Sequence, residues 1–547
     1  MTETEPVEDT ERVEDTEHVD GIAIPGAETV PADLLAAFLA YERAILANDL
    51  DALDAFFAPG EGTMRGDDAG LLVGHDAISA FRSLRGGVSG RDIERIEHRA
   101  LADDVALITS VSRFHAGGRG LQTQVWTRTA EGWRITAAHV SPRPRAFDRA
   151  IWRTVGDPLF QGAWEGPLTG LTVAVKDLFA IKGYRIGAGN PAYLESVKPE
   201  TSMAAAVADL LRGGASLRGI ARTDEFAYSV AGDNAHYGTP PNGAVPGALP
   251  GGSSSGPASA VSTGHADIGL ATDTAGSVRV PASYQGLWGL RTTHGLVPRQ
   301  GLLPLAQSFD TVGWLTRDGA TLQRVADWCL SYDGSASTEN VYGESSDELP
   351  RRLVVPAEAL EIVEPDTRAA FEALLERLEL PVERIGIGAL AAYQEPFRIV
   401  QGAEAWRNNG EWLRAHPGSV GPAVAERFRA AAAITPDQER DARAALEPLK
   451  ERIEGVVADA VLILPTVPGP APMRTADGAR VDAVRTATLR LTTPVAVAGI
   501  PAVSAPLLTI PSRLGPAPVG VCLASRAGTD IALVRLARQL ASTLEIA

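Results

Sequence analysis

The first part of the chain shows two different spacings of apolar residues. Over residues 31–57, apolar side chains recur every three or four positions, which predicts helices that bury one face. Asn48-Asp49 interrupts this run, so two helices are expected there, and a third is expected at residues 75–84. Residues 92–141 hold four largely alternating segments separated by turn residues, as in an antiparallel meander. Helices followed by a meander indicate a small α+β domain.

Four polar residues in this region are candidates for buried or functional positions. Glu42 lies on the apolar stripe of the first predicted helix. Because carboxylates are rarely buried unless they are paired, we expect it at the edge of the stripe, reaching solvent, with a buried acid as the alternative. His75, His115 and His139 stand singly in the sequence. Isolated histidines are more often structural than catalytic, so a binding or docking role is favoured for this domain.

Beyond residue 166, continuous apolar runs replace the alternating pattern. Runs such as LTVAV and VLILP are typical of strands in a sheet that is covered on both faces. Residues 201–214 predict a helix that ends at two glycines, and residues 215–223 predict a further strand. We therefore expect a large α/β domain with a mixed sheet, joined to the first domain through a connection at residues 146–165.

Charge distinguishes a third region at the N-terminus. Residues 1–20 carry nine acidic side chains and one basic side chain, in a chain whose formal net charge is −18. We expect residues 1–27 to form a disordered acidic tail, residues 28–146 the α+β domain and residues 147–547 the α/β domain. The chain has no basic patch, no apolar leader and no apolar run of about 18 residues. These features predict a cytoplasmic protein that binds neither nucleic acid nor membrane.

The sequence offers no metal or cofactor motif. The two cysteines, Cys329 and Cys522, each stand among apolar residues, as buried thiols do. Histidines and cysteines do not occur at the spacings of metal sites, and no phosphate-binding glycine motif follows a predicted strand. We therefore expect neither a metal nor a cofactor.

Three polar residues stand in settings suited to covalent catalysis at a carbonyl. Lys176 ends the apolar strand LTVAVK, where burial would lower its pKa and provide a neutral amine. Ser253 lies in the turn GGSSSG, and Ser277 lies in the turn TAGS, 24 residues later. A serine turn alone is ordinary loop chemistry, and a lysine at a strand end is ordinarily a surface residue. The functional interpretation depends on all three occurring in this order and spacing.

Residues 166–547 closely resemble the amidase signature family, on the pieces VAVKD, ARTDEFAYS, PGGSSSG, GLATDTAGSVRVPAS and GLWGLRTTHG. The resemblance implies the α/β amidase signature fold, a mixed central sheet covered by helices. It also implies a Ser–cis-Ser–Lys triad, with Ser277 as nucleophile, Ser253 as the bridging serine after a cis peptide bond, and Lys176 as base. Tyr228 lies in the region with which the family lines its acyl pocket, so it is a candidate for substrate contact, with plain packing as the alternative. Backbone N–H groups would form the oxyanion hole, those of Thr274, Ala275, Gly276 and Ser277.

Two features complicate this resemblance. Ala275 replaces a glycine that many family members have, which we expect to narrow the pocket near the acyl carbon. GGSSSG also formally fits the nucleophile elbow G-x-S-x-G of α/β-hydrolases, with Ser254 as nucleophile. An elbow needs a strand just before it, and the proline-rich residues 241–250 are a poor strand, so the elbow is disfavoured.

Residues 28–145 resemble the small cone-shaped SnoaL-like domains of the nuclear transport factor 2 fold, and AtzH-like domains in particular. The similar pieces are AAFLAYERAILANDLDALDAFF, VGHDAISAFR and WRITAAHVS. The resemblance implies an α+β cone. Because this domain is fused to a complete catalytic core, we expect it to dock against the amidase domain or to join copies of the chain into a homo-oligomer.

These patterns together predict a serine amidohydrolase, an amidase that cleaves the C–N bond of a small-molecule amide through an acyl-enzyme. Two alternatives stay open: hydrolysis of ureide, carbamate or ester bonds by the same triad, and a catalytically silent binding protein. The substrate hints disagree. Residues 304–318 resemble amidases that act on indole-3-acetamide and similar small amides, whereas the AtzH-like domain points to carboxybiuret-type ureides.

Overall fold

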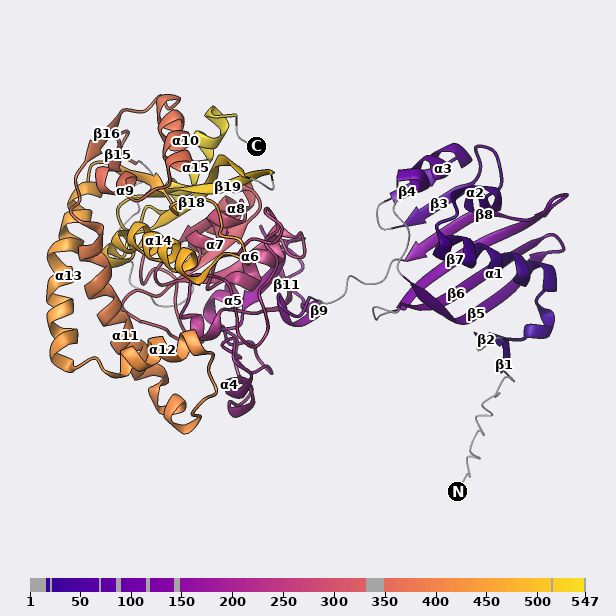
Figure 1. Cartoon of the computed structure of the whole chain (residues 1–547), viewed down its shortest axis with the longest axis horizontal. Helices are drawn as coiled ribbons and strands as arrows, with labels where there is room; N and C mark the ends of the chain where they lie inside the picture. Colours follow the sequence, from indigo (N-terminus) through magenta and orange to yellow (C-terminus); the bar gives the residue numbers. More distant parts are fainter. Residues whose placement is uncertain are drawn as a thin grey trace, which may run out of the picture. The chain divides into compact units, whose positions relative to one another are not determined.

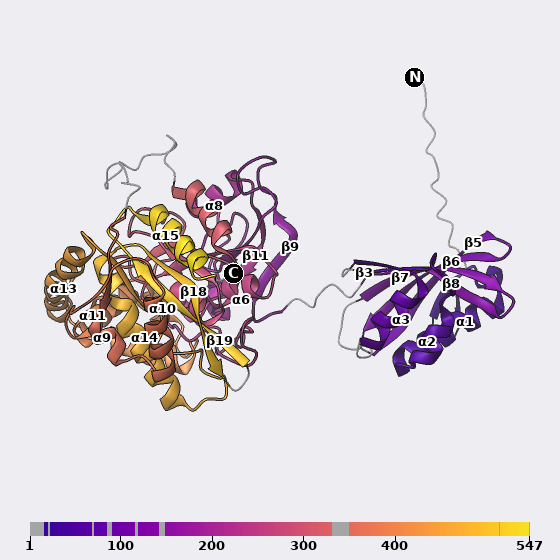
Figure 2. The same cartoon turned by 90° about the horizontal axis from the view of Figure 1, so that it is seen from above.

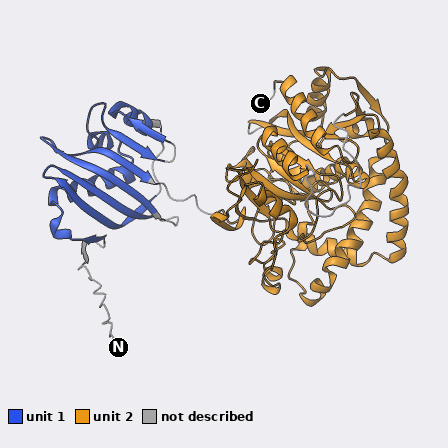
Figure 3. Cartoon of the chain, turned by 180° about the vertical axis from the view of Figure 1, so that it is seen from behind, with its two compact units in different colours: residues 1–147 blue, residues 148–547 orange. Residues whose placement is uncertain are grey.

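The chain folds into two compact units, residues 1–147 and residues 148–547 (Figure 3). The computed structural model describes residues 16–19, 22–67, 70–84, 90–114, 119–141, 148–330, 349–512 and 515–545. Each unit has a hydrophobic core of its own.

The front unit is an eight-stranded sheet with three helices on one face (Figure 2). The strand order is β1-β2-β5-β6-β7-β8-β3-β4, and β5 to β8 form the expected antiparallel meander. The strands are β1 Thr16–Val19, β2 Ile22–Pro25, β3 Met64–Asp67, β4 Gly70–Val73, β5 Arg91–Ala102, β6 Val105–Phe114, β7 Arg119–Thr129 and β8 Gly132–Ser141. The helices are α1 Ala32–Ala47, α2 Leu50–Phe56 and α3 His75–Leu84, after a short 3-10 turn at Ala27–Thr29.

The expected break between the first two helices is confirmed. Asn48 ends α1 in the left-handed conformation, at φ 53°. Asp49 then caps α2, because its side chain accepts the N–H of Ala52 at 3.1 Å. Asparagine tolerates positive φ and aspartate is a favoured N-cap, so the dipeptide stops one helix and starts the next.

The acidic tail is shorter than predicted. Residues 1–15 lie outside the described residues, but β1 and β2 occupy Thr16–Val19 and Ile22–Pro25, where disorder was expected. Ile24 is fully buried in the core of the front unit, and Ala23 pairs with Arg95 of β5. The isoleucines that flank Ala23 supply apolar surface and strand propensity at the end of an otherwise polar segment.

Glu42 corrects the expectation of a carboxylate that reaches solvent, because it is 5% exposed. Arg91 of β5 donates to one carboxylate oxygen through Nε at 3.2 Å and Nη2 at 2.7 Å. Gln122 of β7 donates to the other oxygen at 2.9 Å. These donors replace the water that a carboxylate loses on burial. They lie 49 and 80 residues away in the sequence, so the helix pattern cannot reveal them.

The second unit is built on an 11-stranded mixed sheet covered by helices, as expected (Figure 1). The strand order is β16-β15-β17-β19-β18-β13-β14-β12-β10-β11-β9. The strands are β9 Trp152–Phe160, β10 Thr172–Lys176, β11 Ser216–Ala221, β12 Ile268–Asp273, β13 Trp288–Arg291, β14 Thr311–Thr316, β15 Leu353–Pro356, β16 Val382–Ile385, β17 Val461–Pro465, β18 Ala502–Ser512 and β19 Gly515–Ala524.

Helices cover this sheet, and several of them come from the C-terminal half of the chain. The helices α11, α12, α13 and α14 pack on one another. Within the described ranges, no helix combines the length and apolar character needed to cross a membrane. The helices are α4 Pro191–Ser196, α5 Ala205–Arg212, α6 Ser255–Ser262, α7 Arg279–Tyr284, α8 Gly319–Leu330, α9 Ala357–Glu361, α10 Pro365–Glu376, α11 Leu390–Ala415, α12 Pro422–Ala432, α13 Pro436–Val457, α14 Gly478–Ala498 and α15 Asp530–Thr543, with a 3-10 turn at Glu225–Ala227.

The segment interpreted as a connection between the domains is largely a strand. Trp152–Phe160 forms β9 at the edge of the large sheet and pairs antiparallel with β11. Trp152 is buried, and it packs with Ile151, Ala174 and Ala221. Apolar and polar residues alternate poorly in this segment, and it contains a proline. Proline is tolerated in an edge strand, but its presence does not predict one.

The buried Glu42 gives a prediction for stability. Arg91→Met should destabilise the front unit by about 3–5 kcal/mol, because the substitution leaves a buried carboxylate without its cation. Arg95→Met is the matched control, since Arg95 is exposed and its pair with Glu97 contributes about 0–1 kcal/mol. Hydrogen exchange of the full chain, measured by mass spectrometry on peptides of β5 to β7, gives the free energy of opening. Equal protection in the two variants would contradict this role of Arg91.

Candidate active site

Lys176, the last residue of β10, lies at the centre of the site. The strand runs between β11 and β12, and the side chain is completely buried. Its Nζ donates to three hydroxyl oxygens, Ser253 Oγ at 2.8 Å, Ser254 Oγ at 2.9 Å and Thr272 Oγ1 at 2.8 Å. An ammonium has three N–H donors, so each of them has an acceptor.

Burial lowers the pKa of Lys176 to about 7. Desolvation disfavours the ammonium form, while the charges of Asp224, Asp273 and Asp310 favour it. The surrounding hydroxyls are neutral, so they bond the ammonium without fixing its charge. The amine and the ammonium are therefore both accessible close to neutral pH.

The first serine turn, residues 251–255, is held close to β11 and the segment after it. The peptide bond Gly252–Ser253 is cis, as the family resemblance implied. The carbonyl oxygen of Ser253 accepts the N–H of Asp224 at 3.1 Å and the hydroxyl of Thr223 at 2.8 Å. A Cβ on Gly252 would lie 2.1 Å from a carboxylate oxygen of Asp224, so only glycine fits there.

The second serine turn, residues 274–277, places Ser277 next to Ser253. The hydroxyl of Ser253 donates to Ser277 Oγ at 3.0 Å. Both residues are buried, because Ser253 is 0% exposed and Ser277 is 3% exposed. A continuous line of hydrogen bonds therefore joins Lys176, Ser253 and Ser277, the three residues that the sequence selects.

Asp273 holds the second serine turn in place through hydrogen bonds. Its carboxylate accepts Arg279 Nε at 3.0 Å and Nη2 at 2.9 Å, and Arg291 Nη1 at 3.0 Å. All three side chains are fully buried, and the two guanidinium groups hold the pKa of Asp273 well below its usual range. The carboxylate also accepts the backbone N–H of Gly276 at 2.8 Å. That N–H is therefore engaged inside the turn.

The other amides proposed for the oxyanion hole differ from Gly276. Within the described residues, the N–H groups of Thr274, Ala275 and Ser277 meet no acceptor. The carbonyl of Ala275 accepts the hydroxyl of Thr492 at 2.6 Å, which ties the turn to α14. The turn thus presents donors while its own carbonyl is bonded to the protein.

Asp310 supports the start of the same turn. It accepts the hydroxyl of Thr274 at 2.6 Å and the N–H groups of Leu305 and Ala306 at 2.9 Å each. Burial raises the pKa of Asp310 to about 6, against these hydrogen bonds, which favour the carboxylate. Sequence reasoning missed this residue, because the 36 residues between Thr274 and Asp310 carry no signal of the contact.

Two of the three hydroxyls around Lys176 were also missed. Ser254 donates its own proton to the carbonyl of Thr272 at 3.2 Å and cannot be the elbow nucleophile, since no strand precedes it. Thr272 belongs to β12, whose parallel register with β10 pairs Val175 with Leu270. A threonine at the end of a buried strand is the available signal, but the neighbouring strand must be known before it can be used.

Tyr228 lies in the segment between Lys176 and the first serine turn, as expected, and packs under the C-terminal helices. Its ring lies 5.2 Å from that of Phe428 of α12, centroid to centroid. Its hydroxyl lies 3.5 Å from the position of a Cβ on Gly402 of α11. Contact of Tyr228 with a substrate stays a prediction.

The remaining candidates form no second site in the described part of the chain. His75 lies near the carbonyl of Asp54, at 3.3 Å, and His139 is exposed on β8. His115 lies outside the described residues. Both cysteines are free, and burial raises the pKa of each thiol. Among the residues that the structure describes, no group of three metal-ligating side chains occurs.

Comparisons with known proteins match each of the two parts of the chain to a family. The Amidase family model matches residues 157–534, and the AtzH-like family model matches residues 24–145. The chain is 36% identical over 403 residues to Amidase 1 of Arabidopsis thaliana, covering 69% of this chain and 93% of that protein. A crystal structure of an amidase superposes with a TM-score of 0.62 at 28% identity, over 72% of this chain and 92% of that chain.

A second solved structure comes from a vestigial protein complex that reveals the evolutionary origins of an s-triazine catabolic enzyme. Its TM-score is 0.64 at 28% identity, over 70% of this chain and 86% of that chain.

The relatives contradict the prediction of a cytoplasmic location. One of them is the chloroplastic outer envelope protein 64 of Arabidopsis thaliana, 30% identical over 329 residues, covering 56% of each protein. Another is the mitochondrial outer envelope protein 64 of the same plant, 39% identical over 168 residues, which are 31% of this chain and 28% of that protein. Similar sequences therefore occur at organelle envelopes. Segments that direct a protein to its compartment can lie outside the shared part, so the composition of that part does not decide location.

Proposed function

Because this chain belongs to the amidase signature family of hydrolases that act on amides, we propose that it cleaves a small-molecule amide through Lys176, Ser253 and Ser277. One observation carries the proposal: a hydrogen-bonded line leads from a buried amine, whose pKa is about 7, to a serine hydroxyl. A serine needs such a base, since its hydroxyl is a weak nucleophile at its ordinary pKa.

Activation of the nucleophile requires the hydrogen bonds to reverse. In the ammonium form Lys176 donates to Ser253, which donates to Ser277. When Lys176 is neutral, its lone pair accepts the proton of Ser253, and Ser253 accepts that of Ser277. Ser254 is unsuited to this relay, because its proton is used by the carbonyl of Thr272. Ser253 is the hydroxyl that touches both Lys176 and Ser277.

The reaction then follows acyl transfer. Ser277 Oγ attacks the amide carbonyl, and the negative charge on its oxygen is stabilised by N–H groups of the second serine turn. Of the four amides considered, that of Gly276 suits this role least, since it already donates to Asp273. The proton held by Lys176 returns through Ser253 to the leaving amine, which departs as the C–N bond breaks. Water, activated by the same relay, hydrolyses the acyl-enzyme.

Ser277→Ala should lower amide turnover by about 10⁶-fold, as loss of the nucleophile does in other serine hydrolases. A fluorophosphonate probe should label the wild-type protein at Ser277, identified by mass spectrometry of the labelled peptide. Ser542→Ala, an exposed serine on α15, is the matched control and should label like the wild type. Equal labelling of Ser277→Ala and wild type would refute the assignment.

The pH dependence should report the base. The value of kcat/KM for a neutral amide should rise with pH through about 7, because only neutral Lys176 can accept a proton and the neutral form dominates above its pKa. Lys176→Ala should remove this limb and lower kcat/KM by about 10²–10⁴-fold. Lys182→Ala, at an exposed lysine nearby, should leave the profile unchanged. A profile that stays flat from pH 5 to 9 in the wild type would exclude Lys176 as the base.

We further propose that the front unit joins copies of the chain. Large apolar side chains are exposed on β3, β4 and β7: Met64 at 42%, Leu71 at 65%, Val73 at 55% and Leu121 at 45%. Met64 and Val73 are cross-strand partners, so these two lie side by side. An exposed apolar group of this kind is typical of an interaction surface.

The chain should therefore be oligomeric in solution through the front unit. Size-exclusion chromatography with light scattering should give a multiple of 57.4 kDa for the full chain. Replacing Leu71 and Val73 with Ser should give a monomer, because the replacement removes two exposed apolar side chains from the surface. Arg113→Ser, at an exposed position on β6, is the control. A monomeric wild type would contradict this proposal without bearing on the amidase activity.

A further inference from the structure

The last part of α14 is buried and contains two adjacent threonines. Every residue at positions 491–498 is buried. Inside a helix, a threonine hydroxyl commonly bonds the carbonyl four residues earlier. Thr493 follows this rule, because its hydroxyl donates to the carbonyl of Leu489. Thr492 makes a further bond that leaves the helix.

This further bond joins Thr492 to the second serine turn. Its hydroxyl oxygen lies 2.6 Å from the carbonyl oxygen of Ala275 and 3.0 Å from that of Thr488 in its own helix. A hydroxyl has one proton, and the shorter of the two contacts leads to the turn. The backbone carbonyl of Thr492 also accepts Nη1 of Arg279 at 3.0 Å. Thr492 is buried, so bulk water does not compete for these bonds.

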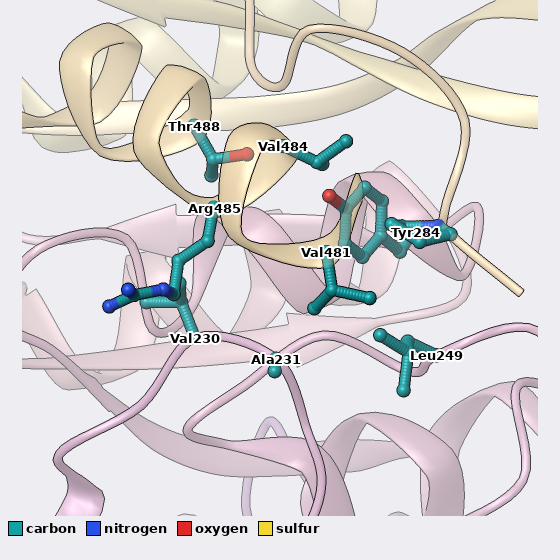
Figure 4. Close-up of a pocket in the computed structure, with 9 residues that line it drawn as sticks. Val230, Ala231, Leu249, Tyr284, Val481, Val484, Arg485 and Thr488 are labelled. Atoms are coloured by element: carbon teal, nitrogen blue, oxygen red, sulfur yellow. The ribbon is translucent and has the colours of Figure 1, made fainter. Parts of the chain in front are cut away.

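The same face of α14 contacts segments next to both serine turns. Val484 and Thr488 precede Thr492 at helical spacing, and they line a small, mainly apolar pocket opposite Tyr284 and Leu249 (Figure 4). Thr488 and Thr492 are one helical turn apart, about 5.4 Å along the axis. The helix face that forms this pocket wall therefore continues to the turn that carries the nucleophile.

Thr492 and Asp273 hold one peptide group from opposite sides. The group joins Ala275 to Gly276. Its carbonyl accepts the hydroxyl of Thr492, and its N–H donates to Asp273 at 2.8 Å. Because a trans peptide is planar and its C=O and N–H point in opposite directions, the two bonds together fix its orientation.

Gly276 joins this anchored peptide to the nucleophile and has an unusual backbone conformation. Its φ is +125°, which residues with a side chain rarely adopt. A Cβ there would lie 3.0 Å from Val280 Cγ2 and 3.2 Å from both Cγ2 and Oγ1 of Thr492. The carbonyl of Gly276 accepts the N–H of Val280 at 2.7 Å. The N–H of Ser277 belongs to that same peptide and points the other way, where the described residues offer it no acceptor.

We propose that Thr492 is a positioning residue for acyl transfer, which holds the second serine turn so that its free N–H groups meet the oxyanion. The inference rests on the proposed amide hydrolysis and goes beyond it, because it gives the C-terminal half of the chain a part in the chemical step. In the described part of the chain, Thr492 makes no hydrogen bond to Lys176, Ser253 or Ser277, so it acts through the peptide after Ala275. Donors held in place stabilise developing charge without having to reorganise.

The test removes the hydroxyl and keeps the shape of the side chain, with Thr492→Val. On acetamide, benzamide and indole-3-acetamide, kcat should fall about 10–10²-fold while KM stays unchanged, because the lost contact acts only in the transition state. Thr492→Ala should behave alike, and Thr492→Ser should recover most of the activity because it restores a donor. Thr493→Val is the matched control: it removes the neighbouring buried hydroxyl, which bonds its own helix, and should leave kcat unchanged.

A fluorophosphonate gives a second readout that does not depend on the choice of amide. As Ser277 Oγ bonds the phosphorus and fluoride leaves, the proton passes through Ser253 to Lys176, and negative charge gathers on the phosphoryl oxygen. That oxygen needs the same donors as the oxyanion of an amide. The second-order rate constant for labelling should therefore fall in Thr492→Val and Thr492→Ala. Both variants should keep the rise of kcat/KM with pH through about 7, because the proton relay is unchanged.

Each outcome decides the proposal. Wild-type kcat and labelling rates in Thr492→Val and Thr492→Ala overturn it. Equal losses in Thr492→Val and Thr493→Val overturn it too, because both hydroxyls then only stabilise α14. A rise in KM with kcat unchanged assigns Thr492 to substrate binding and also overturns it.

Folding and the proposed function are tested separately. If Thr492→Val does not fold, the comparison of Thr492→Ala with Thr492→Ser decides by the same criteria. A wild type that neither hydrolyses an amide nor takes the probe at Ser277 refutes the proposed amidase function, and this inference with it.

Discussion

The second unit depends on accommodating an amine in a dry interior. Lys176 is completely buried, and an isolated ammonium there would cost several kcal/mol in lost hydration. Three hydroxyls supply the missing hydrogen bonds, two from the first serine turn and one from β12. For them to reach one nitrogen, β12 must lie beside β10 and the turn must lie directly over the strand end. The small residues of the turn allow this approach, and a Cβ at position 252 would collide with the carboxylate of Asp224.

Asp273 shows the opposite use of burial, and it directly follows Thr272, one of the residues that bond Lys176. It is as buried as Lys176, yet two arginines hold its pKa far below the ordinary range, so it stays ionised. Lys176 has neutral partners at hydrogen-bond distance, and its pKa falls to about 7. Charged partners fix the charge of a buried group, whereas neutral partners leave it free to change. The first arrangement suits a group that anchors a turn, and the second suits a group that exchanges a proton.

Sequence patterns located the residues of the site but could not supply their surroundings. Lys176, Ser253 and Ser277 follow from local motifs, and the meander β5 to β8 follows from alternation that is visible within each strand. Thr272 and Asp310 are ordinary residues in the sequence and acquire a role only when strands and loops meet. The burial of Glu42 was not predicted for the same reason, because its partners Arg91 and Gln122 lie on β5 and β7. The tail was misjudged because two isoleucines sufficed to add a strand to an existing sheet.

The pocket of Figure 4 is assembled from distant parts of the chain. The three residues of the hydrogen-bonded line lie between positions 176 and 277, whereas much of the pocket wall comes from α14, more than 200 residues later. The pocket wall and the hydrogen-bonded line are thus supplied by separate stretches of one chain. A substitution in α14 can therefore change the pocket wall without changing any residue of the hydrogen-bonded line. The Thr492 hydroxyl that bonds Ala275 marks the boundary that such a change has to respect.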